Sequence, residues 1–378
     1  MNLDFSDDQK ALQAQVRRFL AEKCPPAAVR AVLEGPAPYD RALYLGLAEL
    51  GALGVAIPEE YGGMGLSHLE LCLIAEELGR VVAPLPVASS IYLAAEFLLQ
   101  AGSEAQKAKW LPRLASGEAV GAFAMVEGQG RMAPDKIQAT VRSGRLSGVK
   151  SPVADGVAAD FAIVAARAGP GRGENAISLF IVELAGAGVT RETLETIDPS
   201  LSYARLTFDG APAEPLGAEG DGWRIAGQVQ DRAAILMAFE QLGGADRTLI
   251  MARDYALERM AFGRPIGSFQ AIKHMLADMY VSATLARSNC YYGAWALASG
   301  SSELPVAAAT ARVSATQAFQ HCAKNNIQVH GGMGFTWAFD CHLYYRRSNA
   351  LALALGSQST WESLLIERMR TGNLEAAA

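Results

Sequence analysis

The carboxylate of Glu240 stands in an apolar stretch of sequence. Its neighbours Met237, Phe239 and Leu242 are hydrophobic and lie within a longer run of helix-forming residues. Burial among such side chains raises the pKa of a carboxyl group, and a general base that works near neutral pH needs a raised pKa. Glu240 is therefore the first candidate for acid–base chemistry, ahead of Asp231, which follows polar residues.

The histidines and cysteines of this chain do not indicate metal or thiol chemistry. The five histidines show no H-E-x-x-H or other metal-ligand spacing, so we expect no metal. The five cysteines form no C-x-x-C pair, and an odd, scattered set fits a reducing cytoplasm better than a disulfide framework. Cys24 is the one expected to be exposed, whereas four are expected to be small core residues: Cys72, Cys290, Cys322 and Cys341.

The composition is that of a compact globular protein with two or three domains. The chain has 378 residues, of which 51% are hydrophobic and 19% charged. A formal net charge of −6 argues against a general nucleic-acid binder, which would carry a basic face. The N-terminus opens into an amphipathic helix, and no apolar run is long enough to cross a bilayer. We therefore expect a cytoplasmic protein without a membrane span.

The first part of the chain, residues 1–117, is predicted to be a helical domain. Ser6 is followed three residues later by Gln9, which is a capping-box pattern at the start of a helix. Apolar residues repeat at helical spacing over 43–53 and 69–78, and a glycine-rich turn at 57–65 separates these segments.

The middle part, residues 118–219, is predicted to be a small antiparallel β-domain. Short runs of β-branched and aromatic residues occur at 161–165, 177–182 and 203–208, with turn residues between them. The stretch Gly169–Gly173 has a Gly-x-Gly-x-Gly pattern, but a strand follows it where a dinucleotide-binding loop would require a helix. We therefore expect a hairpin loop there.

The last part, residues 220–378, is predicted to be a helical bundle of the four-helix type. Long segments rich in Ala, Leu and Met at 245–260, 272–299 and 306–329 are joined by short connections. The fold class is therefore α+β and mostly α, with helical domains on both sides of the β-domain in sequence.

Four segments resemble signatures of the acyl-CoA dehydrogenase family. They are residues 53–63 (LGVAIPEEYGG), 146–150 (LSGVK), 259–270 (RMAFGRPIGSFQ) and 328–336 (QVHGGMGFT), and they occur in the family's order. The resemblance implies an FAD-dependent enzyme that introduces an α,β double bond into an acyl-CoA thioester. It also implies an electron-transferring flavoprotein as the electron acceptor.

The resemblance assigns cofactor roles to the last two segments. Arg259 would offer its fixed guanidinium to the pyrophosphate of an FAD bound mainly by the neighbouring subunit. Phe262 and Phe269 would be apolar walls, and glycines without a Cβ would let the backbone approach the dinucleotide closely. The implied FAD-binding residues are Arg259, Phe262, Phe269, Gln270, Gln328, Gly331 and Gly332.

The chain departs from the family where the catalytic base is expected. Counting from Gly331 and Gly332 places the usual glutamate at Leu355, and the alternative base position of some members falls near Ala233 and Ala234. Glu240 lies seven residues beyond Ala233, about 10 Å along the same helix face, which is too far for direct proton transfer. Glu240 is therefore only a tentative base. A structural glutamate that pairs with a buried cation, or that closes the floor of an acyl pocket, is the favoured alternative.

The family's own-chain flavin contacts are also changed. Residues 126–131 (VEGQGR) replace a stretch usually similar to Thr-Glu-Pro-x-Ala-Gly-Ser-Asp, and Pro152-Val153-Ala154 replaces Trp-Ile-Thr. The threonine that contacts the flavin ring edge in the family is thus Ala154. The contacts that a chain gives to its neighbour's cofactor are better preserved than those to its own.

These features leave three functional hypotheses. The chain is either an autonomous, homo-oligomeric dehydrogenase or a partner subunit in a heterotetramer with a paralogous chain that supplies the base. The ending 353–357 (LALGS) resembles the second chain of bacterial heteromeric members that act on bulky thioesters such as sterol side-chain CoA esters. A scaffold that has lost flavin altogether is disfavoured by the intact motifs at Arg259 and Gln328.

Overall fold

The computed structural model describes residues 5–377, with side chains up to Thr371, and it divides the chain into two compact units. The helical unit contains the chain up to Val29, His68–Ala83 and the chain from Ala234 onward. The sheet unit contains Arg30–Ser67 and Pro84–Ala233. The predicted sequence of helical, β and helical parts is confirmed, whereas the domain boundaries near 117 and 219 stay a prediction.

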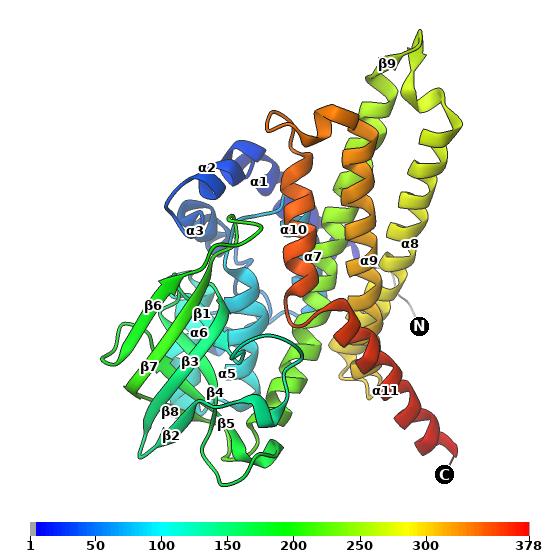
Figure 1. The fold of residues 1–378 in the computed structure, drawn as a ribbon. Helices are drawn as coiled ribbons and strands as arrows, with labels where there is room; N and C mark the ends of the chain where they lie inside the picture. Colours follow the sequence, from blue (N-terminus) through cyan, green and yellow to red (C-terminus); the bar gives the residue numbers. More distant parts are fainter. Residues whose placement is uncertain (1–4, 378) are drawn as a thin grey trace. The chain divides into compact units, whose positions relative to one another are not determined.

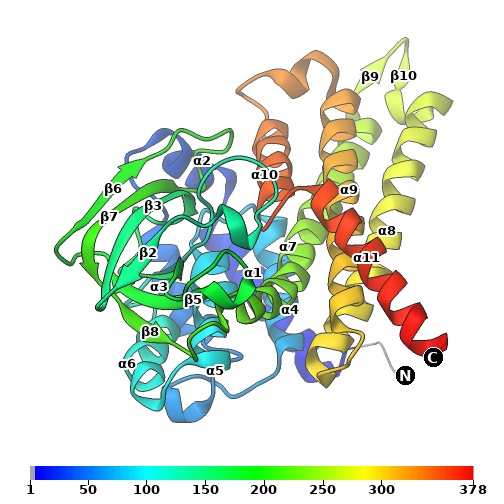
Figure 2. The ribbon, with the colours of Figure 1, turned by 60° about the horizontal axis from the view of Figure 1, so that its bottom comes forward.

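Long helices build the helical unit, and α8 and α9 run side by side in both views (Figures 1 and 2). A short hairpin of β9 (Met260–Ala261) and β10 (Arg264–Pro265) joins α7 to α8. The helices of this unit are α1 (Asp7–Lys23), α4 (His68–Arg80), the larger part of α7 (Gly222–Glu258), α8 (Gln270–Ser299), α9 (Leu304–His330), α10 (Cys341–Leu353) and α11 (Gln358–Ala377).

The helix ends follow local sequence signals. The Ser6 hydroxyl accepts a hydrogen bond from the backbone N–H of Gln9, and the Gln9 side chain accepts one from the backbone N–H of Ser6, so the predicted capping box is confirmed. Gly300, with a φ of 61°, ends α8 in the left-handed conformation that glycine adopts without strain. The helix expected at 245–260 is instead the last part of the 37-residue α7. Glycines 243 and 244 weaken the local helix signal there, and packing overrides that weak propensity.

Helices α4 and α7 cross at glycines, with almost no space between their backbones. A Cβ added to Gly79 would lie 1.7 Å from the carbonyl oxygen of Glu240, and one added to Gly243 would lie 1.9 Å from that of Glu76. Real Cβ atoms do not approach other atoms so closely, so these two positions require glycine.

A network of buried charges ties α1, α4 and α8 together beside this crossing. Glu77 accepts hydrogen bonds from Arg17 at 2.7 and 2.8 Å and from Arg80 at 3.2 Å. Glu76 accepts from Arg287 at 3.1 Å and from Arg80 at 3.3 Å. Burial raises the pKa of the Glu76 carboxyl, and the nearby arginines oppose that rise.

The sheet unit combines short helices with one twisted sheet. Within the described chain, the sheet has eight strands in the order β6-β7-β3-β2-β4-β5-β8, with β1 paired to β4 (Figure 1). The strands are β1 (Gly121–Ala124), β2 (Thr140–Arg142), β3 (Arg145–Ala154), β4 (Phe161–Arg167), β5 (Ile177–Glu183), β6 (Val189–Thr193), β7 (Tyr203–Pro212) and β8 (Glu214–Leu216). The helices are α3 (Arg41–Glu49), a π-helix (Ala88–Ala95), α5 (Glu96–Ala101), α6 (Glu104–Ala115) and the start of α7, and α2 (Pro26–Glu34) connects the two units in sequence.

Three details differ from the sequence predictions. The sheet is mixed and not purely antiparallel, because β4 pairs in parallel with both β1 and β2 across long connections. Helix α3 ends at Glu49, where a turn replaces the helix expected to reach residue 53. Cys24 is buried like the other four cysteines, because it closes the C-terminal end of α1. The hairpin loop expected at 169–173 is confirmed, since β4 and β5 pair antiparallel on either side of it.

The α4–α7 crossing yields a prediction about stability. Gly243→Ala should lower the free energy of unfolding by about 1–3 kcal/mol, because the added methyl group must push the two backbones apart. The matched control is Gly227→Ala, an exposed position of the same helix where an added Cβ meets no atom within 4 Å. The control should raise stability by about 0.5–1 kcal/mol through reduced flexibility of the unfolded chain. Thermal and urea unfolding measure both, and equal effects of the two substitutions would contradict the crossing.

Candidate functional site

The hairpin between α7 and α8 lies at one end of the helical unit (Figure 1), and its sequence carries aromatic and basic residues. Phe262 is 94% exposed and has a φ of 51°, an uncommon backbone conformation for a residue other than glycine. Its ring contacts Phe269 edge-to-face at 6.1 Å, and the Arg264 guanidinium lies 4.1 Å from the centre of the Phe269 ring. The hairpin thus displays an apolar surface that the helical unit itself does not cover.

Arg259 stands at the junction of α7 and this hairpin. Its backbone N–H donates to Tyr255, and its carbonyl accepts from Ile266, so both sides of the residue are fixed. Its side chain is exposed, and within the described part of the chain the guanidinium has no hydrogen-bond or ion-pair partner. Arg259 is therefore able to bind an external anion without first breaking an internal contact.

The motif 328–336, which contains Gly331 and Gly332, lies at the end of α9. Gln328 is exposed on the last turn, and Gly331 follows with a φ of 61°. A Cβ added to Gly331 or Gly332 would meet no atom within 4 Å, whereas one added to Gly334 would lie 2.6 Å from the Ile327 carbonyl oxygen. Gly334 is thus required by packing, but the first two glycines leave an open surface that a ligand could approach closely.

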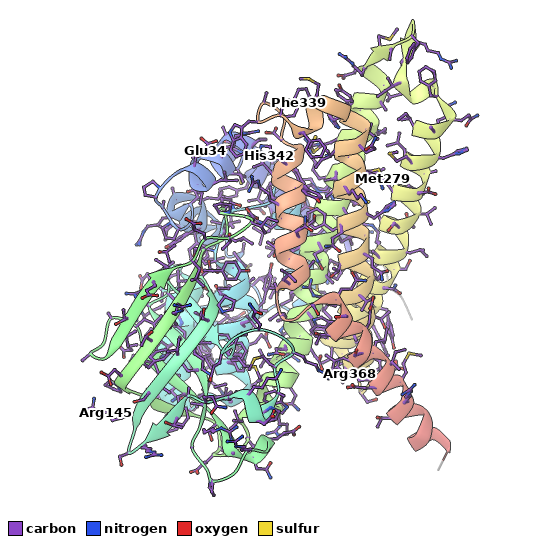
Figure 3. All side chains as sticks on the ribbon, viewed as in Figure 1. Glu34, Arg145, Met279, Phe339, His342 and Arg368 are labelled. Carbon is purple, nitrogen blue, oxygen red and sulfur yellow. The ribbon has the colours of Figure 1, made fainter. Side chains whose placement is uncertain are left out.

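An aromatic stack joins these two motifs. The ring of Tyr255, one turn before Arg259, lies parallel to the His330 ring with centroids 4.0 Å apart, and Phe339 contacts both rings edge-on. His330 donates from Nδ1 to the Asn326 carbonyl oxygen at 2.8 Å, and burial lowers the pKa of its imidazole. Figure 3 shows Phe339 near the start of α10. Sequence reasoning missed Tyr255 and His330, although both adjoin residues that the motifs had marked.

The base positions implied by the resemblance are apolar. Leu355, in the turn between α10 and α11, packs against a buried cluster of Ala234, Ala309 and Trp361. Ala233, which precedes Ala234 in α7, is also fully buried. Leu355 and Ala234 therefore lie close together although they are distant in sequence, and neither offers a carboxylate.

Glu240 occupies a structural position at the α4–α7 crossing. Its side chain is buried, and its Oε1 lies 3.8 Å from Nη1 of Arg347, which is 1% exposed. Arg347 also donates to the carbonyl oxygens of Val82 and Ala83 at 3.1 and 3.0 Å, just beyond the end of α4. This geometry favours the structural alternative for Glu240, a carboxylate paired with a buried cation.

The sheet unit contains a pocket of about 590 Å³ on the outer face of β3, β6 and β7. It brings together the two segments that resemble altered flavin contacts, one around Gly128 and Gln129 and the other at Ser151 and Pro152. The other lining residues are Glu127, Val149, Glu192, Arg205 and Thr207. The segment 126–131, which lines part of the pocket, lacks the hydroxyl groups of the family pattern, but residues of β3, β6 and β7 still enclose a pocket.

A buried ion pair supports one wall of this pocket. Lys150 donates to Glu127 at 2.6 Å and to the Met125 carbonyl oxygen at 3.2 Å. The Glu127 carboxylate also accepts from the backbone N–H groups of Gln138 and Ala139 at 2.6 and 3.1 Å. Burial lowers the pKa of Lys150 to about 8, and the charge of Glu127 limits that decrease.

Comparison with known proteins places these features in a family. Residues 6–118 match the model of the acyl-CoA dehydrogenase N-terminal domain, and residues 220–369 match that of the C-terminal domain. The chain is also 33% identical to acyl-CoA dehydrogenase IpdE2 of Mycobacterium tuberculosis, over 93% of this chain and 94% of that protein. The chain belongs to the acyl-CoA dehydrogenase family. Members of this family are FAD flavoproteins that act as oxidoreductases.

Solved structures of acyl-CoA dehydrogenases share the fold over nearly the whole chain. Butyryl-CoA dehydrogenase from Megasphaera elsdenii has a TM-score of 0.89 at 27% identity, with 98% of this chain and 100% of that one covered. A chain of the ChsE4–ChsE5 complex from Mycobacterium tuberculosis has a TM-score of 0.87 at 27% identity, with both chains fully covered. Over the described residues, none of the helices is long and apolar enough to cross a membrane.

The Glu240–Arg347 contact can be tested by a double-mutant cycle. Glu240→Gln keeps the shape of the side chain but removes the charge beside a buried guanidinium, so it should lower the free energy of unfolding by about 1–3 kcal/mol. Arg347→Met should also be destabilising, and the double variant should lose less than the sum of the two single variants. Denaturant unfolding measures the coupling, and strictly additive losses would show that the two charges do not interact.

The lowered pKa of Lys150 predicts a pH dependence of stability. The folded chain releases the proton near pH 8, whereas the unfolded chain holds it up to the ordinary pKa of 10.5. The unfolded state therefore binds more protons between these two values, and stability contributed by this group must rise with pH in that window. Relative to Lys150→Met, the free energy of unfolding of the unaltered chain should increase from pH 8 to pH 10.5. A difference that stays constant over this range would show that the lysine has its ordinary pKa.

Proposed function

We propose that this chain is one subunit of a heteromeric, FAD-dependent acyl-CoA dehydrogenase, in which a paralogous chain supplies the catalytic base. The observation that carries the proposal is the apolar convergence of Leu355 and Ala234 at the two base registers. The nearest candidate carboxylate in register, Glu240, is already paired with the buried Arg347. At these two registers, the described residues therefore offer no group suited to remove the α-proton of a thioester.

The residues at the hairpin and at the end of α9 fit the dinucleotide of an FAD held mainly by the partner. Arg259 has a free guanidinium for a pyrophosphate, and Gly331 and Gly332 leave open space for close approach. The exposed Phe262 and the half-buried Phe269, with Gln270 and Gln328, would complete this surface. FAD, when bound, supplies the hydride acceptor for dehydrogenation of the acyl group. The contribution of this chain is to bind and orient the cofactor.

The contrast between the two flavin surfaces supports the heteromeric assignment. The residues expected to contact a neighbour's cofactor all match the family pattern, whereas strand β3 has Pro152, which lines the pocket, and Ala154 where that pattern has an aromatic residue and a hydroxyl. One similar structure is described as a complex of two differently named chains, ChsE4 and ChsE5. The substrate would be an acyl-CoA thioester, and the electron acceptor would be an electron-transferring flavoprotein.

Two alternative functions must be distinguished from this proposal by experiment. An autonomous homo-oligomeric dehydrogenase would have to use Glu240 or another carboxylate as its base. A non-catalytic partner would complete the FAD site and the interface of a catalytic paralogue without contacting substrate.

Purification of this chain alone and together with a paralogous acyl-CoA dehydrogenase chain distinguishes these functions. The visible spectrum reports flavin, and dehydrogenation of an acyl-CoA with an artificial electron acceptor reports activity. We expect a colourless single chain and a yellow, active co-purified complex. A yellow single chain whose activity is abolished by Glu240→Gln, with flavin still bound, would instead establish the autonomous enzyme.

Arg259 gives a direct test of the cofactor surface. Arg259→Ala should weaken flavin binding by about 1.5–3 kcal/mol, or roughly 10- to 100-fold, because it removes a charge-assisted contact to phosphate. The matched control is Arg253→Ala, which removes another exposed arginine of α7 that pairs only locally with Asp254. Flavin retention during dialysis of the assembly measures both variants. Equal retention in the two would remove Arg259 from the site.

A further inference from the structure

The cofactor surface proposed for this chain is divided between the ends of two helices. Arg259 follows the last residue of α7, and Gly331 follows the last residue of α9. One dinucleotide can contact both parts only if their separation is fixed, because a binding constellation must be held within about 0.5 Å of its productive geometry. A contact between the two helix ends must therefore set that separation.

The hairpin that follows Arg259 is too short to fix its own position. Its strands, β9 and β10, have two residues each, and a two-stranded ribbon of that length has little stability by itself. It is instead attached to the last turn of α7, where the Arg259 N–H donates to the Tyr255 carbonyl oxygen at 2.8 Å. Gly267 packs so closely on the same turn that an added Cβ would lie 2.9 Å from the Ala256 carbonyl oxygen. The position of Arg259 therefore follows the position of that turn.

A stack of aromatic rings links this turn to the end of α9. The Tyr255 ring lies parallel to the His330 ring, with centroids 4.0 Å apart and an angle of 22° between the planes. Phe339, labelled in Figure 3, contacts the two rings edge-on at 6.1 and 5.8 Å. Tyr255 is thus bonded to Arg259 through its backbone and stacked through its ring on the residue that precedes Gly331.

The imidazole of His330 is held in the plane that this stack requires. It is 7% exposed, and its Nδ1 donates to the Asn326 carbonyl oxygen at 2.8 Å, one turn earlier in α9. Burial lowers the pKa of the ring below its usual 6.5, so the ring is neutral at pH 7 and needs no buried counter-charge. The ring can therefore act as a rigid spacer between the two helix ends.

We propose that the stacked rings of Tyr255 and His330 are positioning groups, which set the separation between Arg259 and the glycines at the end of α9. The inference rests on the proposed function, and it adds to that function two residues that are not themselves expected to contact the cofactor. Phe339 closes the edge of the stack and keeps both rings in place. The effect of the stack on cofactor binding must then pass through Arg259 and the glycines.

A double-mutant cycle with Arg259 tests this role through the affinity for FAD. FAD is titrated into the assembly from which flavin has been removed, and the flavin fluorescence reports binding. Tyr255→Leu removes the ring but keeps an apolar side chain, and it should weaken FAD binding about three- to tenfold, the size of one aromatic contact. In the Arg259→Ala background the same change should weaken binding less than about twofold, because the guanidinium that the stack positions is absent. Equal losses in the two backgrounds would overturn the positioning role.

Substitutions of His330 separate the stack from a general loss of stability. His330→Ala should weaken FAD binding as Tyr255→Leu does, and it replaces that variant in the cycle if Tyr255→Leu does not fold. His330→Phe restores a flat ring and should recover most of the lost affinity. The matched control is Tyr291→Leu, which removes a ring stacked on Phe239, about 30 Å along α8 from the hairpin, and should lower the thermal midpoint without changing the affinity. A His330→Phe variant as weak as His330→Ala, or a loss of affinity in the control, would contradict the stack as the cause.

The cycle also distinguishes failure of this inference from failure of the proposed function. If Arg259→Ala leaves the affinity for FAD unchanged, the proposed cofactor surface is wrong and this inference is overturned with it. If Arg259→Ala weakens binding and Tyr255→Leu does not, only the positioning role is overturned. The same titration applies to the single chain if that chain proves autonomous, and the expected result there is the same.

Discussion

The close crossing of α4 and α7 at Gly79 and Gly243 is the constraint on which the helical unit depends. Each glycine lies against a backbone carbonyl of the other helix, so the two helices can approach only in this register. The register in turn brings Glu240 to Arg347 and brings Glu76 to Arg287. Packing of the backbone therefore decides which charges are neutralised inside the unit, and the charges add specificity to an arrangement that sterics already define.

At the same crossing, the sequence around Glu240 suggests a catalytic role, whereas the structure gives this residue a structural role. Glu240 has the apolar neighbours of a tuned base, but those neighbours belong to a helix interface where its partner is a guanidinium. At the other end of the unit, Arg259 begins the 259–270 motif, is exposed, and has no partner among the described residues. Apolar neighbours in sequence therefore do not indicate whether a charged group in this chain is available to bind a ligand.

The sequence predicted the local and periodic features well, because the signals for caps, strands and long helices are local. The capping box at Ser6 and the hairpin after β4 are examples. The parallel pairing of β1 with β4 and the stack of Tyr255 on His330 depend on segments that are distant along the chain, and no local pattern encodes them. The positive φ of Leu355, 59°, was equally hidden, and one donor to the carbonyl beside it, Arg312 of α9, is distant along the chain.

The hairpin that joins α7 to α8 has a consequence for the protein after synthesis and before any assembly. It carries the nearly fully exposed ring of Phe262, with Met260 and Leu257 also exposed beside it, at the end of two long helices. In the proposed heteromer, a newly made copy without its partner would leave this apolar hairpin exposed to chaperones and proteases. Under that proposal, the amount of protein that accumulates would depend on balanced synthesis of the two chains.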